Sequence, residues 1–291
     1  MKDVLLVHLI NWYTQRFPFP FKGLKYFEYI LRKSGLQKHS FLKKLPNGLK
    51  MKLCVGDHIE KYLLWYGYYE KKEIMTMRSL LSENSVVIDI GANIGYFSLM
   101  AAQKCNKGKI YSFEPATKNF QKLEEHLRLN KIKNVTPFQC AVSNRNEVAS
   151  FFISDSHNSG MSGLKPAENF SGETEMIHCI RLDDAIETYQ FQTINLVKID
   201  TEGSELNVLN GMKQVIKQQQ PLLLIEISAS NQALYGNDIK DIFNMLSTYG
   251  YIAYNVIDVN VLNHVSSPGE ADLLFFIPRH FNIPKEITVI Q

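Results

Sequence analysis

The stretch Val86-Val87-Ile88-Asp89-Ile90-Gly91-Ala92-Asn93-Ile94-Gly95 decides the fold. Its first five residues form a nearly continuous apolar, β-branched run that ends directly at a glycine. Such a run is typical of a strand that is buried on both faces of a parallel sheet. The turn after such a strand lies at the carboxyl edge of the sheet, where the ligands of open α/β folds bind. We therefore expect an α/β protein with a ligand site at this turn.

Strand and helix patterns alternate on both sides of this stretch. We expect further strands at 109–114, 135–142, 148–153, 176–182, 194–200, 221–228, 251–256 and 273–278, and helices at 96–104, 117–130, 204–217 and 238–249. Upstream, residues 49–55 alternate like a half-buried strand, and residues 67–81 have helical spacing. Strands separated by helices predict right-handed βαβ units and one doubly wound, mostly parallel sheet.

The composition is that of an ordinary globular protein. The chain has 291 residues, of which 45% are hydrophobic and 21% charged, which excludes the disordered and collagenous classes. The four cysteines are widely spaced and form no C-x-x-C pair, so neither a disulfide framework nor a zinc site is indicated. No apolar run reaches the roughly 20 residues of a membrane span. The beginning of the chain has no secretory pattern, and we expect a cytoplasmic protein.

Charge is distributed unevenly along the chain. The first fifty residues contain ten Lys and Arg but only Asp3 and Glu28 as acids, whereas the remainder has 22 basic and 27 acidic residues. Aromatic residues are interleaved with the basic ones from Trp12 to Tyr29. We therefore predict a basic N-terminal extension or cap at 1–64 and one catalytic domain at 65–291. The extension either packs on the main domain or on a second subunit in a homodimer, or makes peripheral contact with an anionic membrane. No nucleic-acid-binding module is recognisable.

The glycine turn at 91–95 differs from a dinucleotide fingerprint. A G-x-G-x-x-G turn would have glycine where this chain has Asn93, so the turn suits a polar group better than a pyrophosphate. Glu114 follows Gly95 by nineteen residues, where a carboxylate accepts hydrogen bonds from ribose hydroxyls. A nucleoside without a diphosphate fits, and S-adenosylmethionine is such a cofactor. Asp89 and Asn93 would then meet its amino and carboxylate groups, and the backbone near Ala141 and Val142 its adenine. The alternative is a turn that binds nothing.

The second polar segment is Lys198-Ile199-Asp200-Thr201-Glu202-Gly203-Ser204-Glu205. Buried strands rarely end in so many charges unless they open onto a polar site. Glu226 ends the neighbouring predicted strand, so Asp200 and Glu226 should face one crevice. Two interpretations stay open: Asp200 is a general base for an acceptor hydroxyl, or Asp200 and Glu226 hold Mg²⁺. Glu202 and Glu205 would simply begin the next helix.

Other catalytic machinery is less well supported by the sequence. His157 and His178 are alternative bases, although a lone histidine is more often structural. A serine hydrolase is disfavoured because no G-x-S-x-G elbow is present.

Four ordered motifs resemble the FkbM family of S-adenosylmethionine-dependent methyltransferases. They are Asp89–Gly95, Phe113-Glu114-Pro115, Ala141-Val142-Ser143 and Lys198–Gly203, and the resemblance covers about residues 65–228. Upstream, the segment 67–70 is similar to the part of the family that by analogy helps to close the cofactor pocket, which adds Tyr69 and Glu70 to the candidate site.

The resemblance implies a class I Rossmann-like methyltransferase fold and O-methylation of a hydroxyl on a saccharide or natural product. It implies that Asp200 is the leading catalytic candidate, and that the cofactor contacts include Asp89, Gly91, Asn93, Gly95 and Glu114. Two rival functions are an oxidoreductase acting on a sugar nucleotide, against which Asn93 argues, and a non-catalytic cofactor-binding or scaffold protein.

Overall fold

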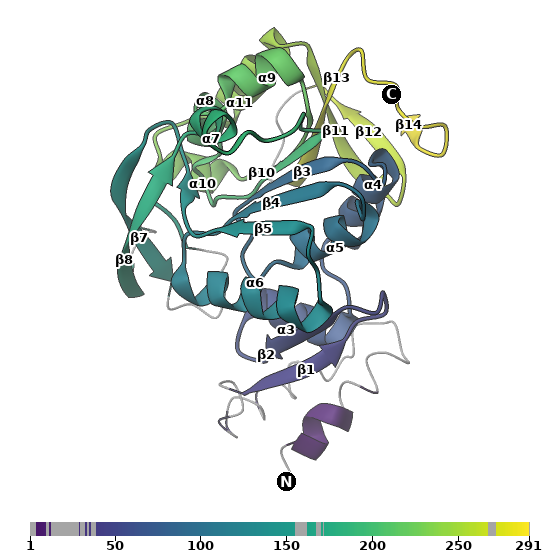
Figure 1. Ribbon diagram of the computed structural model, residues 1–291, viewed down its shortest axis with the longest axis vertical. Helices are drawn as coiled ribbons and strands as arrows, with labels where there is room; N and C mark the ends of the chain where they lie inside the picture. Colours follow the sequence, from purple (N-terminus) through teal and green to yellow (C-terminus); the bar gives the residue numbers. More distant parts are fainter. Residues whose placement is uncertain are drawn as a thin grey trace. The chain divides into compact units, whose positions relative to one another are not determined.

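The computed structural model describes residues 4–9, 12, 29, 33, 35, 39–154, 162–166, 170, 172–266 and 272–290 (Figure 1). The chain divides into two compact units. The first comprises Met1–Glu70 with Ser154–Gly160, and the second comprises Lys71–Ile153 with Met161–Gln291. Helix α3 (His58–Tyr66) runs across the predicted boundary between residues 64 and 65, and the structure instead divides after Glu70.

The N-terminal unit contains an antiparallel hairpin of β1 (Ser40–Lys44) and β2 (Lys50–Cys54), followed by α3. In β2, Met51 and Leu53 are buried while Lys50 and Lys52, which alternate with them, are exposed, which confirms the predicted half-buried strand. The predicted helix over 67–81 is wrong at its beginning. Gly67 ends α3 in the left-handed conformation, with φ 78°, and the next helix, α4 (Lys71–Leu80), begins four residues later.

The second unit is built on a nine-stranded sheet in the order β14-β12-β11-β13-β10-β9-β3-β4-β5 (Figure 1). The strands are β3 (Val86–Ile90), β4 (Lys109–Phe113), β5 (Val135–Phe138), β9 (Leu196–Ile199), β10 (Leu222–Ile227), β11 (Tyr251–Asp258), β12 (Val261–Val265), β13 (Asp272–Pro278) and β14 (Thr288–Ile290). The five strands from β10 to β5 are parallel, and β13 is antiparallel to both β10 and β11. This confirms the predicted doubly wound, mostly parallel, Rossmann-like fold. The chain order reverses between β3 and β9, which makes their carboxyl ends the expected ligand site.

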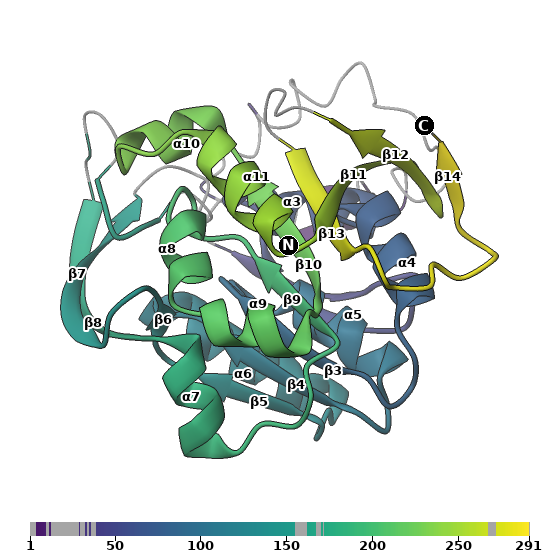
Figure 2. The ribbon, with the colours of Figure 1, turned by 90° about the horizontal axis from the view of Figure 1, so that it is seen from above.

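Helices cover both faces of this sheet (Figure 2). One face carries α4, α5 (Tyr96–Lys104) and α6 (Thr117–Asn130). The other carries α7 (Leu182–Tyr189), α8 (Glu205–Asn210), α9 (Lys213–Gln219) and α11 (Ile239–Thr248), whose apolar residues form one core with alternate residues of β3, β9 and β10. None of the helices in the described ranges combines the length and hydrophobicity that a membrane crossing needs.

Two predicted elements are interrupted in the structure. The predicted strand at 135–142 ends at Phe138, and Ala141–Val142 forms β6 in a separate three-stranded sheet with β7 (Glu147–Ser154) and β8 (Gly172–Ile180). The predicted helix at 204–217 is split into α8 and α9. A side chain at Gly211 between them would overlap the backbone carbonyl of Ser143, so close packing fixes the break.

Several short elements were not predicted. They are β1, α3, α7, the six-residue helix α10 (Ala229–Leu234), β12 and β14. Leu182 begins α7 and does not end a strand as predicted.

Candidate active site

The turn after β3, residues 91–95, is held to the neighbouring strand by its backbone. Gly91 and Ala92 each donate an N–H to the carbonyl of Phe113, at 3.0 Å. Gly91, Asn93 and Gly95 all have positive φ, at 77°, 50° and 86°. We call residues 91–95 the β3 turn.

The two glycines of the β3 turn are required for packing within the protein. A Cβ on Gly91 would overlap the backbone carbonyl of Asp200, and one on Gly95 would overlap the side chain of Leu123. These glycines thus let β9 and α6 pack against the turn. Their contact with a cofactor, which the family resemblance implies, stays a prediction.

Glu114 follows β4 and points its carboxylate at the β3 turn. Its two oxygens accept backbone N–H groups from Asn93 at 2.7 Å and from Ala116 at 2.9 Å. The residue is 4% exposed, and burial raises its pKa to about 7 although these hydrogen bonds act in the opposite direction. The Asn119 side chain also hydrogen-bonds to this carboxylate. A carboxylate has about four lone-pair sites, so it can still accept a hydrogen bond from a ligand.

Asn93 presents a second polar group in the same turn. Its side-chain oxygen is buried, and among the residues that the structure describes it has no hydrogen-bond partner. A buried polar atom without a partner costs free energy, so such atoms in native proteins need an explanation. A polar ligand bound against the β3 turn would provide the missing donor.

Asp89 lies below this turn in β3 and is completely buried. Its carboxylate accepts a hydrogen bond from Ser98, whose hydroxyl also lies 2.7 Å from that of Ser112. The Lys198 ammonium is 3.9 Å from the other carboxylate oxygen of Asp89. Burial raises the pKa of Asp89, while Lys198 and Ser98 lower it. The Asp89 side chain therefore links β3 to α5 and β9, and through Ser98 to β4. Its contact with a cofactor stays a prediction.

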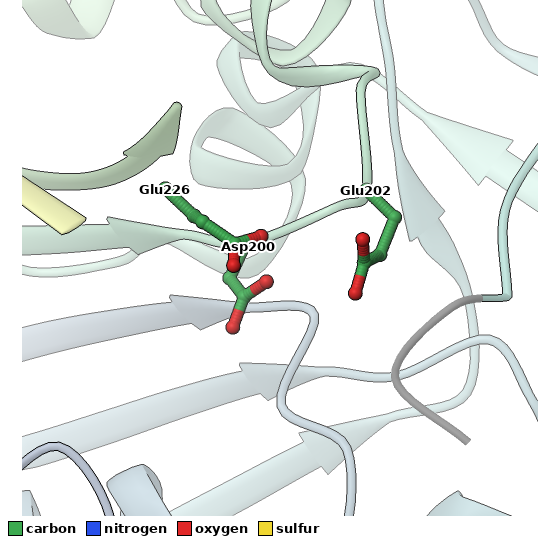
Figure 3. A group of neighbouring side chains, drawn as sticks. All are labelled: Asp200, Glu202 and Glu226. Carbon is green, nitrogen blue, oxygen red and sulfur yellow. The ribbon is translucent and has the colours of Figure 1, made fainter. Parts of the chain in front are cut away.

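The acidic corner consists of Asp200, Glu202 and Glu226, at the ends of β9 and β10 (Figure 3). One carboxylate oxygen from each residue lies within 4.8 Å of the others. β9 and β10 are parallel with Ile199 opposite Ile225, so the next residues along, Asp200 and Glu226, are neighbours, as the sequence predicted. Lys198 lies at the same edge and donates from its ammonium to Asp200 at 2.7 Å.

The three carboxyl groups differ in protonation. Burial favours the neutral form of Asp200, but the charge of Lys198 and hydrogen bonds from Glu226 and Lys198 outweigh it and lower the pKa. The charge of Asp200, together with burial, raises the pKa of Glu226 to about 11. The Glu226 carboxyl group thus keeps its proton and donates a hydrogen bond to the ionised Asp200. Burial and the charges of Asp200 and Glu205 raise the pKa of Glu202 to about 8.

Glu202 is the member of the acidic corner that the sequence analysis missed, because it was assigned to the start of a helix. That helix, α8, begins at Glu205, and Glu202 lies before it with φ 52°. The Glu205 carboxylate accepts the backbone N–H groups of Thr201 at 2.9 Å and Gly203 at 3.1 Å, which fixes the turn. Asn231 donates to Glu202 at 2.8 Å. The sequence signal that could have identified Glu202 as a site residue is a charged residue directly before a glycine at the end of a strand.

Other predicted residues are not part of this cluster. Tyr69 and Glu70 belong to the N-terminal unit, where the Tyr69 ring packs edge-on against Tyr62. His178 is exposed on β8 of the three-stranded sheet, and His157 lies outside the described residues. In β6, Ala141 and Val142 are buried and pair with Cys179 and Ile180, so any contact with adenine would come from their backbone.

Comparison with known families gives one match over most of the second unit. The sequence model described as "Methyltransferase FkbM domain" matches residues 89–253, which include every member of the β3 turn and the acidic corner.

Three curated proteins are similar to this chain. Methyltransferase sdnD of Sordaria araneosa is 30% identical over 46% of this chain and 62% of its own length. Hexuronic acid methyltransferase AglP of Haloferax volcanii is 30% identical over 61% of this chain and 68% of its own. The 31-O-demethyl-FK506 methyltransferase FkbM of Streptomyces tacrolimicus is 30% identical over 49% of this chain and 67% of its own. The chain thus spans less than two thirds of the length of the Sordaria protein.

Proposed function

The chain belongs to the FkbM family of methyltransferases, and from this premise we propose that it transfers a methyl group from S-adenosylmethionine to a hydroxyl of a saccharide or natural-product acceptor. The observation that carries the proposal is the contact between the β3 turn and the acidic corner, where Gly91 lies against the carbonyl of Asp200. A nucleoside-binding turn and an ionised carboxylate thus share one sheet edge. The names of two relatives support an oxygen acceptor, because one contains "31-O-demethyl" and the other a hexuronic acid.

The residues of the β3 turn fit the cofactor. Glu114 is oriented by Asn93, Ala116 and Asn119 and keeps acceptor capacity for a ribose hydroxyl. The buried side-chain oxygen of Asn93 can accept a hydrogen bond from the amino group of the methionine part. When bound, S-adenosylmethionine supplies a methyl group on a positively charged sulfur, which is open to attack by an oxygen.

Asp200 is the group of the acidic corner that is suited to act as general base. Lys198 and the proton of Glu226 keep it ionised, and it is 27% exposed while Lys198 is 6% exposed. Its carboxylate can accept the proton of an acceptor hydroxyl that lies within hydrogen-bond reach. Glu226 then acts by holding Asp200, because a protonated carboxyl group does not accept a proton.

The acidic corner fits Mg²⁺ poorly. The Lys198 ammonium already supplies positive charge at 2.7 Å from Asp200. We therefore derive no metal-dependent step.

Calorimetric titration with S-adenosylmethionine, S-adenosylhomocysteine and NAD tests the cofactor. We expect the first two to bind and NAD to fail, because Asn93 replaces the glycine that a pyrophosphate needs. Binding of NAD alone would favour the oxidoreductase. Binding of S-adenosylmethionine without any methyl transfer to the acceptors described next would favour the non-catalytic protein.

The methylated atom is tested with methyl-labelled S-adenosylmethionine and oligosaccharides with and without hexuronic acid. A methyl ether on a hydroxyl survives mild alkali, whereas a methyl ester on a carboxylate is hydrolysed and releases methanol. We expect alkali-stable label in the saccharide. Label that is lost completely in alkali would contradict O-methylation of a hydroxyl.

A further inference from the structure

An apolar stripe is exposed on the first helical segment of the N-terminal unit, residues 4–9 and 12. The N-terminal stripe, as we call it, consists of Val4, Leu5, Leu9 and Trp12. Leu5 is 71% exposed, Leu9 59% and Trp12 56%. Helical residues follow one another by about 100°, so Val4, Leu5 and Leu9 of the helix at 4–9 fall within about 140° around its axis, in a sector that also holds exposed His8. Val7 falls outside this sector and is buried, so the helix turns a mostly apolar side to solvent.

Exposed large apolar side chains are concentrated in this part of the chain. Five of the fifteen found among the described residues lie before residue 34, where only nine residues are described. They are the N-terminal stripe and Tyr29. Single exposed apolar residues are normal, but a contiguous set marks a surface that binds a protein or a membrane.

The charge of the segment decides between these partners. Ten basic residues against two acids in residues 1–50 leave an excess of eight positive charges. A second copy of this unit would bring an equal positive charge to the contact, which opposes association. An anionic bilayer attracts it, at about 1 kcal/mol for each Lys or Arg near the surface. Nucleic acid would satisfy the charge but offers no apolar layer to Leu5 and Leu9.

We propose that the N-terminal stripe docks this protein on the surface of an anionic membrane. The helix lies in the plane of the interface, with Leu5 and Leu9 in the acyl region, as interfacial helices do. Trp12 and Tyr29 are residue types that gather at the level of the lipid headgroups. The contact is peripheral, and it is independent of the proposed methyl transfer.

Vesicle flotation of the full chain tests the proposal. Phosphatidylcholine vesicles are compared with vesicles that also contain phosphatidylglycerol, each at low and high salt. The test variant is Leu5→Ser with Leu9→Ser, and the matched control is Leu42→Ser, because Leu42 is 65% exposed in the hairpin of the same unit. We expect binding to anionic vesicles only, weakened by salt, unchanged by the control and lowered about tenfold or more by the double variant.

Four results would overturn the proposal. Equal binding to neutral and anionic vesicles would show that charge does not contribute. Equal loss of binding in the double variant and in Leu42→Ser would show that the N-terminal stripe is not the binding surface. A salt-sensitive binding that the double variant retains would indicate a purely ionic site for polyanions. If no vesicle binds and the double variant dissociates an oligomer on size exclusion, the stripe is a contact between copies. Far-UV circular dichroism and S-adenosylmethionine binding check that each variant is folded.

Discussion

Glu114, which lies against the β3 turn, and Asp200 of the acidic corner are carboxyl groups at the same sheet edge, but they are held in different ways. Glu114 is held by the backbone N–H groups of Asn93 and Ala116 and by the Asn119 side chain, and burial raises its pKa to about 7. Asp200 is fixed by side chains, namely the ammonium of Lys198 and the proton of Glu226, which keep it ionised. The first arrangement suits a group that accepts hydrogen bonds from a bound nucleoside. The second suits a group that must stay ionised and take up a proton.

Replacing Asp200 should have the largest effect and should break the acidic corner alone. In Asp200→Asn the side chain no longer accepts a proton, and we expect kcat to fall by about 10²- to 10⁴-fold, the usual contribution of a general base. The dissociation constant for S-adenosylmethionine should stay nearly unchanged. The matched control is Glu226→Gln, which preserves a neutral donor and should lower kcat far less. Equal losses in both variants would remove the distinction between base and positioning residue.

Replacing Lys198 should affect folding more than cofactor contacts. Lys198→Met leaves Asp89 and Asp200 without their buried cation, and removing one partner of a buried pair costs about 3–5 kcal/mol. Urea unfolding measures this change in the free energy of unfolding. The control is Lys107→Met, which breaks the exposed pair with Glu83 and should cost about 0–1 kcal/mol. A similar small cost at both positions would show that Lys198 is not needed to offset the buried acids.

Removing the Glu114 carboxylate should weaken cofactor binding at the β3 turn and leave the acidic corner unchanged. Glu114→Ala should weaken S-adenosylmethionine binding by about 1.5–3 kcal/mol, the contribution of hydrogen bonds to a charged group. Calorimetric titration measures it, and turnover at saturating cofactor should change little. An unchanged dissociation constant would refute the assignment of Glu114 to the ribose.

The pKa of Glu114 predicts a pH dependence of cofactor affinity. Because this pKa is raised to about 7, Glu114 becomes protonated as the pH falls through 7 and loses acceptor capacity. S-adenosylmethionine affinity should therefore decrease when the pH is lowered from about 8 to about 6. Glu114→Gln cannot titrate and should show a flat profile. A slope that persists in the glutamine variant would assign the titration to another group.

The smallest expected effect is that of a chelator. Because the Lys198 ammonium already balances the charge of Asp200, we expect methyl transfer to continue at the same rate in EDTA. Loss of activity in EDTA that added Mg²⁺ restores would return the acidic corner to the metal interpretation.

The sequence predicted those parts of the site that depend on local pattern. The apolar run of β3, the turn at Gly91 and the acid after β4 are contiguous motifs, and their place at the sheet edge follows from the fold class. Asp200 and Glu226 were brought together correctly because parallel neighbours end at one edge.

The rest depends on contacts that are distant in the sequence. Glu202 was missed because its orientation depends on Glu205 and on Asn231 of α10, an element that was not predicted. The protonation of Glu226 depends on a neighbour from another strand. The helix break at Gly211 depends on a carbonyl of Ser143. No pattern within one segment contains this information.

The absent side chain at Gly91 has a consequence for the evolution of this enzyme. It lets the Asp200 backbone lie directly against the β3 turn. The distance between the proposed cofactor site and the proposed base, Asp200, is therefore set by two main chains. A side chain at position 91 would push against the main chain at position 200, whichever residue stands there. We therefore expect position 91 to accept only glycine. New acceptor specificities should arise more easily from residues around the acidic corner that are free of this constraint.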